Sequence, residues 1–278
     1  MRIKLDLLEN SQDYVINALE LYKIADEYGE YRDDVADVTK KAKWKLAFIS
    51  MVQALEILLK YGLEKINPVL VYENIDSINL SVEKTVKFSV LMLRLKNFGQ
   101  DPFSEEEELF IKKCSKYRNS FTHYKVDVSA EDIKSKFAKL YMLYCKCYEF
   151  LLGQKITYTN NWIENLHTEL TIFSKEYTFY RGEEVRKSEL EDIKSEYEKY
   201  SKLSYFVNSS GTHVPRIVYG DEHKIVGGEE CRELFTRKNC GDCGVLLGEY
   251  HLPLCDIEVC PICKGQKLSC NCDLSLEV

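Results

Sequence analysis

Several features that would assign this chain to a common class of protein are missing from its sequence. The first residues, from Met1 to Asp6, carry charges where a secretory signal peptide has its apolar segment. No run approaches the roughly 18 consecutive apolar residues that cross a bilayer. There is also no glycine-rich phosphate loop, no Ser-His-Asp arrangement and no HExxH sequence. We therefore expect a cytoplasmic protein without membrane contact, outside the enzyme classes that those motifs define.

The composition is that of a globular protein with an acidic balance. Of the 278 residues, 45% are hydrophobic and 30% are charged, and the formal net charge is −7. This hydrophobic content is sufficient to build a buried core. The negative charge argues against indiscriminate binding to nucleic acid, but it is compatible with a local basic site.

The eleven cysteines are concentrated toward the C-terminal end. Cytosolic thiols stay reduced or bind metal. From Cys240 to Cys272 the sequence reads CGDCGVLLGEYHLPLCDIEVCPICKGQKLSCNC, which contains two CxxC pairs. Such pairs are typical of zinc sites, where both thiolates grip one ion and nearby glycine or proline permits the tight turn.

This segment offers enough soft ligands for two tetrahedral structural zinc sites with no open position for a substrate. The predicted ligands are Cys240, Cys243, His251, Cys255, Cys260, Cys263, Cys270 and Cys272. A sequential partition gives the first four to one ion and the last four to the other, whereas a crossed partition places both CxxC pairs on one ion. Buried or redox-active thiols and an iron–sulfur cluster are the alternatives. Because the segment is short, metal binding is expected to supply its folding energy.

Residues 214–273 also resemble a zinc-ribbon tail found at the C-terminus of many bacterial proteins. The resemblance rests on RIVYG at 216–220, on the first CxxC with its histidine, on CDIE at 255–258, and on CPICKGQ and CNC. It implies a module that docks onto nucleic acid or a protein partner, and it names no reaction.

The N-terminal half has the periodicity of helices. Apolar residues recur at helical spacing over 11–28, 44–62, 86–97 and 130–152, and Ser104 with the following glutamates predicts a capping box. The segment 44–62 is apolar on most sides, which is typical of the central helix of a bundle. The sequence thus predicts a mainly α fold. We expect a helical bundle over 1–152, a helical or irregular connector over 153–212, and a small α+β or irregular zinc-binding domain over 213–278.

One short segment at the end of a predicted helix is suited to RNA. From Lys112 to Lys125 there are five basic residues and no acidic one, and aromatic residues, including Phe121, lie between them. Such a pattern combines phosphate contacts with a stacking surface for unpaired bases. The predicted RNA-binding residues are Lys112, Lys113, Lys116, Tyr117, Tyr124 and Lys125. The alternative is a basic, solvated helix end with a buried histidine.

The same segment contains Arg118, Asn119 and His123. Histidine is suited to proton transfer near neutral pH, and the arginine fork is suited to a phosphate. Asn119 and His123 are four residues apart and share a helical face. An Arg-x4-His spacing alone is a weak signal, because it arises easily by chance.

Together with its surroundings, this motif resembles the HEPN superfamily over residues 10–152. The resemblance rests on QALEILLK at 53–60, PVL at 68–70 and RNSFTH at 118–123. It implies a compact α-helical bundle and a metal-independent ribonuclease, with Arg118 and His123 as the catalytic pair, Asn119 orienting His123 or the scissile phosphate, and Glu56 and Gln53 lining the same cleft. It also implies a homodimer with facing motifs and a role in toxin systems or antiviral defence. For Glu56, an ion pair with Lys60 on the same helix is the alternative.

We therefore expect an endoribonuclease that uses the RNA 2′-hydroxyl as nucleophile and leaves a 2′,3′-cyclic phosphate. A catalytically inactive adaptor that binds nucleic acid or protein is the first alternative. A purely structural or regulatory subunit is the second, and the zinc module is compatible with all three.

Overall fold

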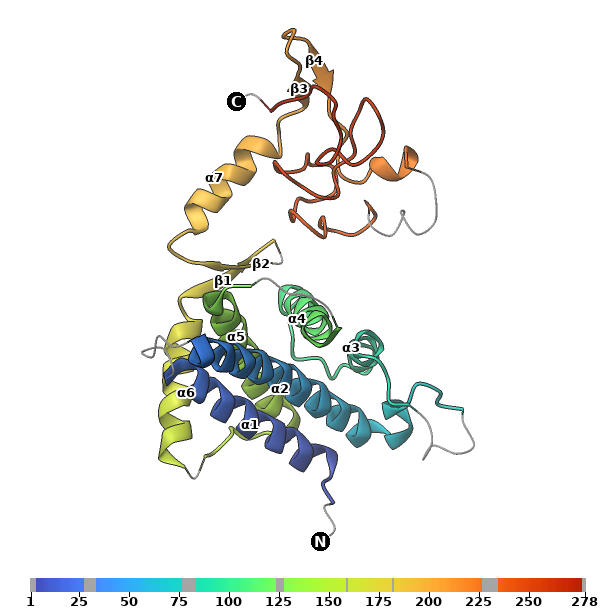
Figure 1. The fold of residues 1–278 in the computed structure, drawn as a ribbon. Coiled ribbons are helices and arrows are strands. Elements are labelled where there is room, and N and C mark those ends of the chain that lie inside the picture. The colour runs from blue at the N-terminus through green and yellow to red at the C-terminus, as the bar shows by residue number, and fades with distance from the viewer. Residues whose placement is uncertain are drawn as a thin grey trace. The chain divides into compact units, whose positions relative to one another are not determined.

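The computed structural model describes residues 4–27, 34–76, 84–123, 128–158, 160–181, 183–226 and 235–276 (Figure 1). The side chains of residues 27, 34–37 and 123 lie outside this description. The chain divides into two compact units, Met1–Tyr177 and Thr178–Val278. Each unit is described below by itself.

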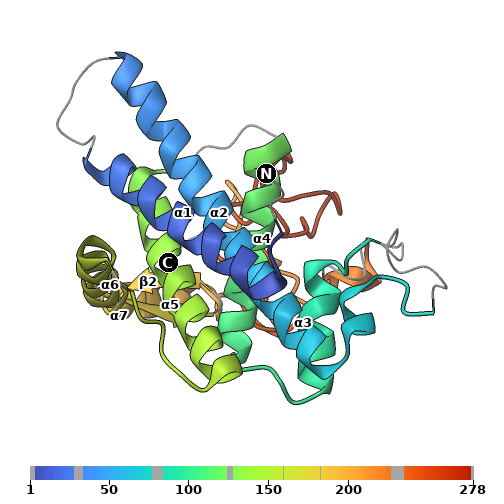
Figure 2. The same ribbon diagram turned by 90° about the horizontal axis from the view of Figure 1, so that it is seen from below.

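The first unit is built from helices, which confirms the predicted mainly α character of the N-terminal half. Its helices are α1 (Leu7–Glu27), α2 (Asp34–Ile66), α3 (Phe88–Asn97), α4 (Glu105–His123), α5 (Ala130–Leu152) and α6 (Asn161–Ser174), with the short 3-10 helix η2 (Pro68–Val71) after α2. Helix α2 packs against α1, α3, α4 and α5, so it is the centre of the bundle (Figure 2).

The central position of α2 follows from its sequence. Almost every side chain from Met51 to Leu59 is buried. By length and composition the stretch Val38–Ile66 would be apolar enough to cross a membrane, but 78% of its most apolar window is buried inside the structure. A helix surrounded by other helices in a globular core has this same composition.

The ends of α4 and α5 are set by local hydrogen bonds. The backbone N–H of Glu107 donates to Ser104 Oγ at 3.3 Å, and Glu107 Oε2 accepts from the N–H of Ser104 at 2.8 Å, as the capping-box prediction requires. Ser129 caps α5 through its hydroxyl, which accepts from the N–H of Asp132. Gly153 ends α5 at φ +70°, a backbone conformation that glycine adopts without strain.

The second unit contains little regular structure. Its elements are β1 (Tyr177–Tyr180), which begins at the boundary, β2 (Glu183–Arg186), α7 (Leu190–Tyr200), β3 (Tyr205–Val207), β4 (His213–Pro215) and the 3-10 helix η4 (Glu222–Lys224). Strand β1 pairs with β2, and β3 pairs antiparallel with β4, with Phe206 opposite Val214. Over residues 235–276 the chain forms turns and isolated bridges. Its core is an apolar cluster that includes Tyr197, Tyr219 and Val245.

The boundary between the two units, after Tyr177, falls inside the connector predicted over residues 153–212. Helix α6 belongs to the first unit because Ile163, Leu166 and Leu170 are buried and the helix packs against α5. Helix α7 and both strand pairs from Thr178 onward belong to the second unit. The segment is therefore divided between two cores.

Candidate metal centres and the Arg118 segment

The eight predicted ligands form two separate groups of four. Cys240, Cys243, His251 and Cys255 form cluster 1. Cys260, Cys263, Cys270 and Cys272 form cluster 2. Within each cluster the ligand atoms all lie within 4.8 Å of one another. The structure thus follows the sequential partition of ligands and not the crossed one.

The spacing within cluster 1 fits a tetrahedral cation. The sulfur atoms of Cys240 and Cys255 are 3.7 Å apart, and His251 Nδ1 lies 3.3 Å from the Cys243 sulfur and 3.1 Å from that of Cys255. Ordinary zinc–ligand bond lengths give tetrahedron edges of about 3.8 Å between two thiolates and about 3.5 Å between a thiolate and an imidazole. A zinc-sized ion therefore fits among these four atoms.

His251 is oriented by a carboxylate that the sequence reasoning missed. Its Nε2 lies 2.7 Å from Glu222 Oε1, and both side chains are completely buried, at 0% exposure. This bond turns Nδ1 toward the three thiols, an arrangement common behind metal-binding histidines. Glu222 lies in η4, and no spacing rule connects it with His251.

Hydrogen bonds among the ligands of cluster 1 shift their pKa values. Burial lowers the pKa of His251, but hydrogen bonds with Cys240, Cys243 and Glu222 outweigh burial and raise that pKa to about 11. Hydrogen bonds with Cys243 and Cys255 lower the pKa of Cys240. A cation bound among these atoms replaces the protons that they otherwise share, so metal binding releases protons.

A second pair that the sequence did not predict is Arg216 and Glu258. Arg216 contacts the backbone of His251 in cluster 1, and Glu258 lies two residues before Cys260 of cluster 2. Arg216 Nε donates to Glu258 Oε1 at 3.0 Å, and Nη2 donates to the carbonyl of His251 at 2.5 Å. Arg216 Nη1 donates to the carbonyl of Leu203, after α7, at 3.0 Å. Burial raises the pKa of Glu258, and the Arg216 guanidinium opposes this rise. Both residues lay in the segments that carry the zinc-ribbon resemblance, but spacing gave them no role.

The two CxxC turns have the same backbone structure. The N–H of Cys240 donates to the carbonyl of Val245, and that of Cys260 donates to the carbonyl of Gly265, both at 2.8 Å. Each turn has a positive φ just after its second cysteine, 72° at Gly244 and 64° at Lys264. The second turn thus places a lysine where glycine is favoured. Burial opposes ionisation of Cys260, but the amides of Cys263 and Ile262 lower its pKa to about 7.

The two clusters differ in burial. In cluster 1, Cys240, His251 and Cys255 are buried, and Cys240 and Cys255 belong to the apolar core of the second unit. In cluster 2 only Cys260 is buried, and Cys263 is exposed. Cluster 1 is therefore part of the core, whereas cluster 2 lies at the surface.

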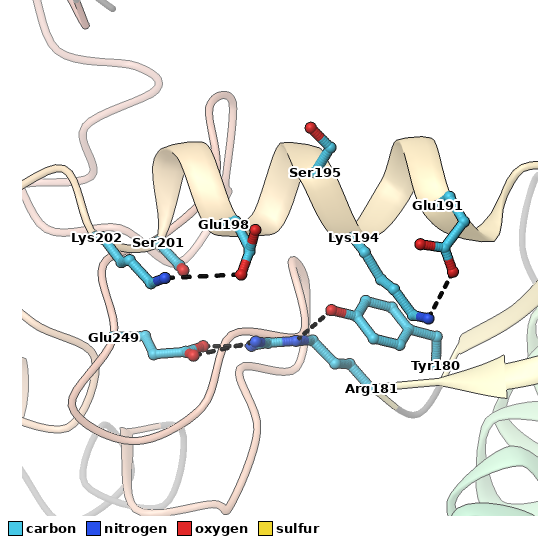
Figure 3. A pocket seen from close by; sticks show the side chains of 9 residues that line it. All are labelled: Tyr180, Arg181, Glu191, Lys194, Ser195, Glu198, Ser201, Lys202 and Glu249. Carbon is cyan, nitrogen blue, oxygen red and sulfur yellow. Dashed lines mark hydrogen bonds and ion pairs between the residues drawn. The ribbon is translucent and has the colours of Figure 1, made fainter.

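A polar pocket of about 500 Å³ lies beside cluster 1, between α7, the β1–β2 turn and Glu249 (Figure 3). Arg181, at φ 52°, lies in this turn, and its guanidinium is 4.5 Å from the ring centre of Tyr197. The cations of the pocket pair with its own carboxylates, as Arg181–Glu249, Lys194–Glu191 and Lys202–Glu198. The Arg181–Glu249 pair joins the β1–β2 turn to Glu249, whereas the two lysine pairs are local to α7 and its end.

In the first unit, the predicted catalytic Arg118 meets two polar residues of α2. Its Nη1 donates to Gln53 Oε1 at 3.0 Å and to Glu56 Oε2 at 2.8 Å. Glu56, only 8% exposed, also accepts from Lys60 Nζ at 2.8 Å. The structure thus brings Arg118 into contact with Gln53 and Glu56, and it also contains the alternative Glu56–Lys60 pair. Arg118 is 21% exposed, and its Nε and Nη2 have no hydrogen-bond partner among the described residues.

The other predicted residues of this segment are spread around α4. Asn119 and Lys116 are exposed, and Lys112 lies 3.4 Å from Glu108. Lys136 Nζ lies 5.7 Å from the ring centre of Tyr117, and Lys113 is half-buried. The backbone of His123 ends α4, whereas its side chain, Tyr124 and Lys125 lie outside the described residues.

Phe121 has a different environment from the one its sequence context suggested. Its ring centre lies 5.6 Å from that of Phe48 on α2, and the side chain is half-buried. It therefore holds α4 against α2 and does not belong to an open stacking surface.

Comparison with known proteins gives no match: no protein-family model, curated protein or solved structure matches this chain. The function of the chain is therefore inferred from its sites.

Proposed function

We propose that each cluster holds one structural Zn²⁺ ion. Three observations support zinc: the sulfur-rich ligand sets, the ligand spacing of cluster 1, and the buried carboxylate behind His251. Four protein ligands complete the coordination of each ion and leave no position for a substrate. The ions would therefore stabilise the second unit and not activate water.

We further propose that the protein is a metal-independent endoribonuclease of the HEPN type. The observation that carries this proposal is the contact of Arg118 with Gln53 and Glu56, because the resemblance assigns all three to one cleft. The proposal includes a homodimer with facing motifs, a cytoplasmic location and a role as toxin or antiviral effector.

In the proposed reaction the 2′-hydroxyl of the RNA attacks the adjacent phosphorus. A bond forms between phosphorus and the 2′-oxygen while the bond to the 5′-oxygen of the next nucleotide breaks. His123 takes the proton from the 2′-hydroxyl or delivers one to the leaving 5′-oxygen, and the two copies in a dimer supply both roles. Arg118 stabilises the charge on the phosphate, and Asn119 orients the reacting groups. The products are a 2′,3′-cyclic phosphate and a 5′-hydroxyl, and DNA is not cut because it lacks the 2′-hydroxyl.

A second candidate function is an inactive adaptor that binds RNA through α4, or a protein through the zinc module. The observation that favours it is the buried position of Glu56 between Lys60 and Arg118. A buried carboxylate needs such partners whether or not there is catalysis. In this candidate, Arg118 holds α4 on α2 and does not contact a scissile phosphate.

The test is cleavage of a labelled structured RNA, such as a tRNA, in buffer with EDTA, after verifying that the zinc content is unchanged. His123→Ala is compared with His213→Ala, which changes an exposed histidine on β4. Arg118→Ala is compared with Arg118→Lys, which keeps a cation beside Glu56. Melting temperatures verify that every variant is folded.

The ribonuclease proposal expects wild type and His213→Ala to cut the RNA with cyclic-phosphate ends, and His123→Ala and Arg118→Ala to lose at least 100-fold in rate, the scale of a lost proton-transfer group. Cutting that survives both substitutions would refute it. RNA binding without cutting of any RNA, in a folded dimer, would favour the adaptor.

A further inference from the structure

A second basic segment lies on α2, outside the predicted RNA-binding residues. From Thr39 to Leu55 the helix carries Lys40, Lys41, Lys43 and Lys45 and no acidic residue. The stretch of α4 from Ile111 to His123 also has no acidic residue and carries four basic ones. Two acid-free basic segments in a chain of net charge −7 produce a local positive potential where they meet.

The contacts between α2 and α4 show where these segments meet. Arg118 contacts Gln53 and Glu56, whereas Phe121, one turn further along α4, packs on Phe48. The two helices therefore run in opposite directions, and α4 lies across α2 (Figure 2). The turn of α2 before Phe48, which contains Lys45, consequently lies beside the end of α4.

The helical register places the lysines relative to the RNSFTH segment. On α4, Arg118 and Phe121 face α2, and Lys116, two residues before Arg118, lies on the opposite side of the helix. On α2, Lys45 is eleven residues, or three turns, from Glu56, so both lie on the same face. Lys41 lies one turn before Lys45. Lys41 and Lys45 are both exposed, and Lys45 forms no ion pair with the described residues.

We propose that this surface, composed of Lys41 and Lys45 on α2 beside the end of α4, holds the phosphate backbone of single-stranded RNA on one side of the scissile phosphate. This inference rests on the proposed ribonuclease function, since the end of α4 beside these lysines is the proposed cleavage site. Lysine heads on flexible stems suit a backbone track without base recognition. Phe121 packs on Phe48 and adds no open stacking surface, so the proposed affinity comes from phosphate contacts.

The experiment compares Lys41→Gln/Lys45→Gln with the matched control Lys87→Gln/Lys155→Gln, which removes the same charge from exposed lysines elsewhere in the first unit. The probe is a single-stranded RNA with 2′-O-methyl groups, which binds but is not cut. Its Kd is measured by fluorescence anisotropy from 0.05 to 0.3 M salt. A cleavable RNA of the same sequence gives kcat and KM.

Loss of two phosphate contacts should reduce the magnitude of the slope of log K against log salt by about 1.4. At 0.1 M salt, the Kd of the double variant should then be about 25-fold higher than that of wild type. The control should remain within about two-fold of wild type. We expect KM to rise with kcat unchanged, because these lysines bind the strand and take no part in proton transfer.

The outcomes separate this inference from the proposed function. If wild type cuts RNA through His123 and Arg118 but the α2 variant behaves like the control, the surface is refuted and the ribonuclease stands. If wild type neither binds nor cuts any RNA, both proposals fall. The wild type could instead bind polyglutamate and no RNA, with weaker polyglutamate binding in Lys41→Gln/Lys45→Gln. In that case the surface would be a site for an acidic protein and not for RNA.

Discussion

Cys255→Ser should unfold the second unit, whereas Cys263→Ser should leave its core intact. Cys255 is buried in the same apolar cluster as Tyr219, Val245 and Val259, so an ion bound at cluster 1 would lie inside that core. Cys263 is exposed, and the core of the unit does not include it. The two substitutions are chemically identical and remove one ligand each.

The magnitudes involved explain this expectation. The apparent binding free energy of a structural zinc ion is about 10–16 kcal/mol, whereas the net stability of a domain is about 5–15 kcal/mol. An ion bound at cluster 1 would therefore contribute as much as the unit's whole stability. Without it, the buried thiols and His251 would also remain as polar groups in an apolar core. Losing the ion of cluster 2 should affect mainly residues 260–276.

The assay uses the full chain and has three readouts. Zinc per chain, measured by mass spectrometry, should fall by one or both ions in Cys255→Ser and by one ion in Cys263→Ser. Limited proteolysis should cut Cys255→Ser throughout Thr178–Val278 while the first unit stays resistant, and near-ultraviolet circular dichroism should weaken. A protease-resistant second unit in Cys255→Ser, or cutting of the whole unit in Cys263→Ser, would refute the assignment of cluster 1 to the core.

Two further predictions concern a buried carboxylate, Glu222, and a half-buried histidine, His167. Glu222→Ala should weaken zinc binding at cluster 1 about 10–100-fold, measured by competition with a chromophoric chelator. Glu222→Gln should lose less, because its amide oxygen still accepts from His251, and equal affinity in all three proteins would contradict the role of Glu222. Burial lowers the pKa of His167, so its contribution to stability is complete above the unfolded pKa of about 6.5 and is lost as pH falls through the folded pKa. Melting temperature should therefore fall less from pH 8 to pH 5 in His167→Gln than in wild type, and an identical fall would show that His167 is not responsible.

The metal ligands could be predicted from sequence because chelation imposes spacing. Both CxxC pairs were recognisable, since two thiolates three residues apart reach one ion. The partition was not predictable, because both schemes used the same residues. What selects the sequential one is the chain path that brings His251 to within 3.3 Å of Cys243 and 3.1 Å of Cys255. For the same reason the contact between Glu222 and His251 could not be predicted, since only the fold brings the two residues together.

Helix boundaries could be predicted from the sequence where local hydrogen-bonding residues mark them. The start of α4 was predictable from Ser104 and Glu107, whose capping bonds are local. Helix α6 was not separated from the predicted connector, although Asn160 caps it and its apolar residues recur every three or four positions. Its assignment to the first unit depends on packing against α5, a contact between distant parts of the sequence. Phe121 was assigned to a stacking surface because sequence does not show which face of α4 meets Phe48.

The hydrogen bonds of Arg118 limit how a phosphate could reach it. Both contacts with α2 use Nη1, which bonds Gln53 and Glu56. A phosphate bound by two parallel hydrogen bonds would then use the edge formed by Nε and Nη2. Because Glu56 is buried and also bonded to Lys60, the guanidinium would be oriented before any RNA binds, and its ordering would not have to be repeated during reaction. The same bonds serve an adaptor equally well by fastening α4 to α2. The Nε–Nη2 edge of Arg118, which has no hydrogen-bond partner among the described residues, therefore bears on the ribonuclease more directly than the ion pair does, since the ribonuclease requires this edge to contact the scissile phosphate.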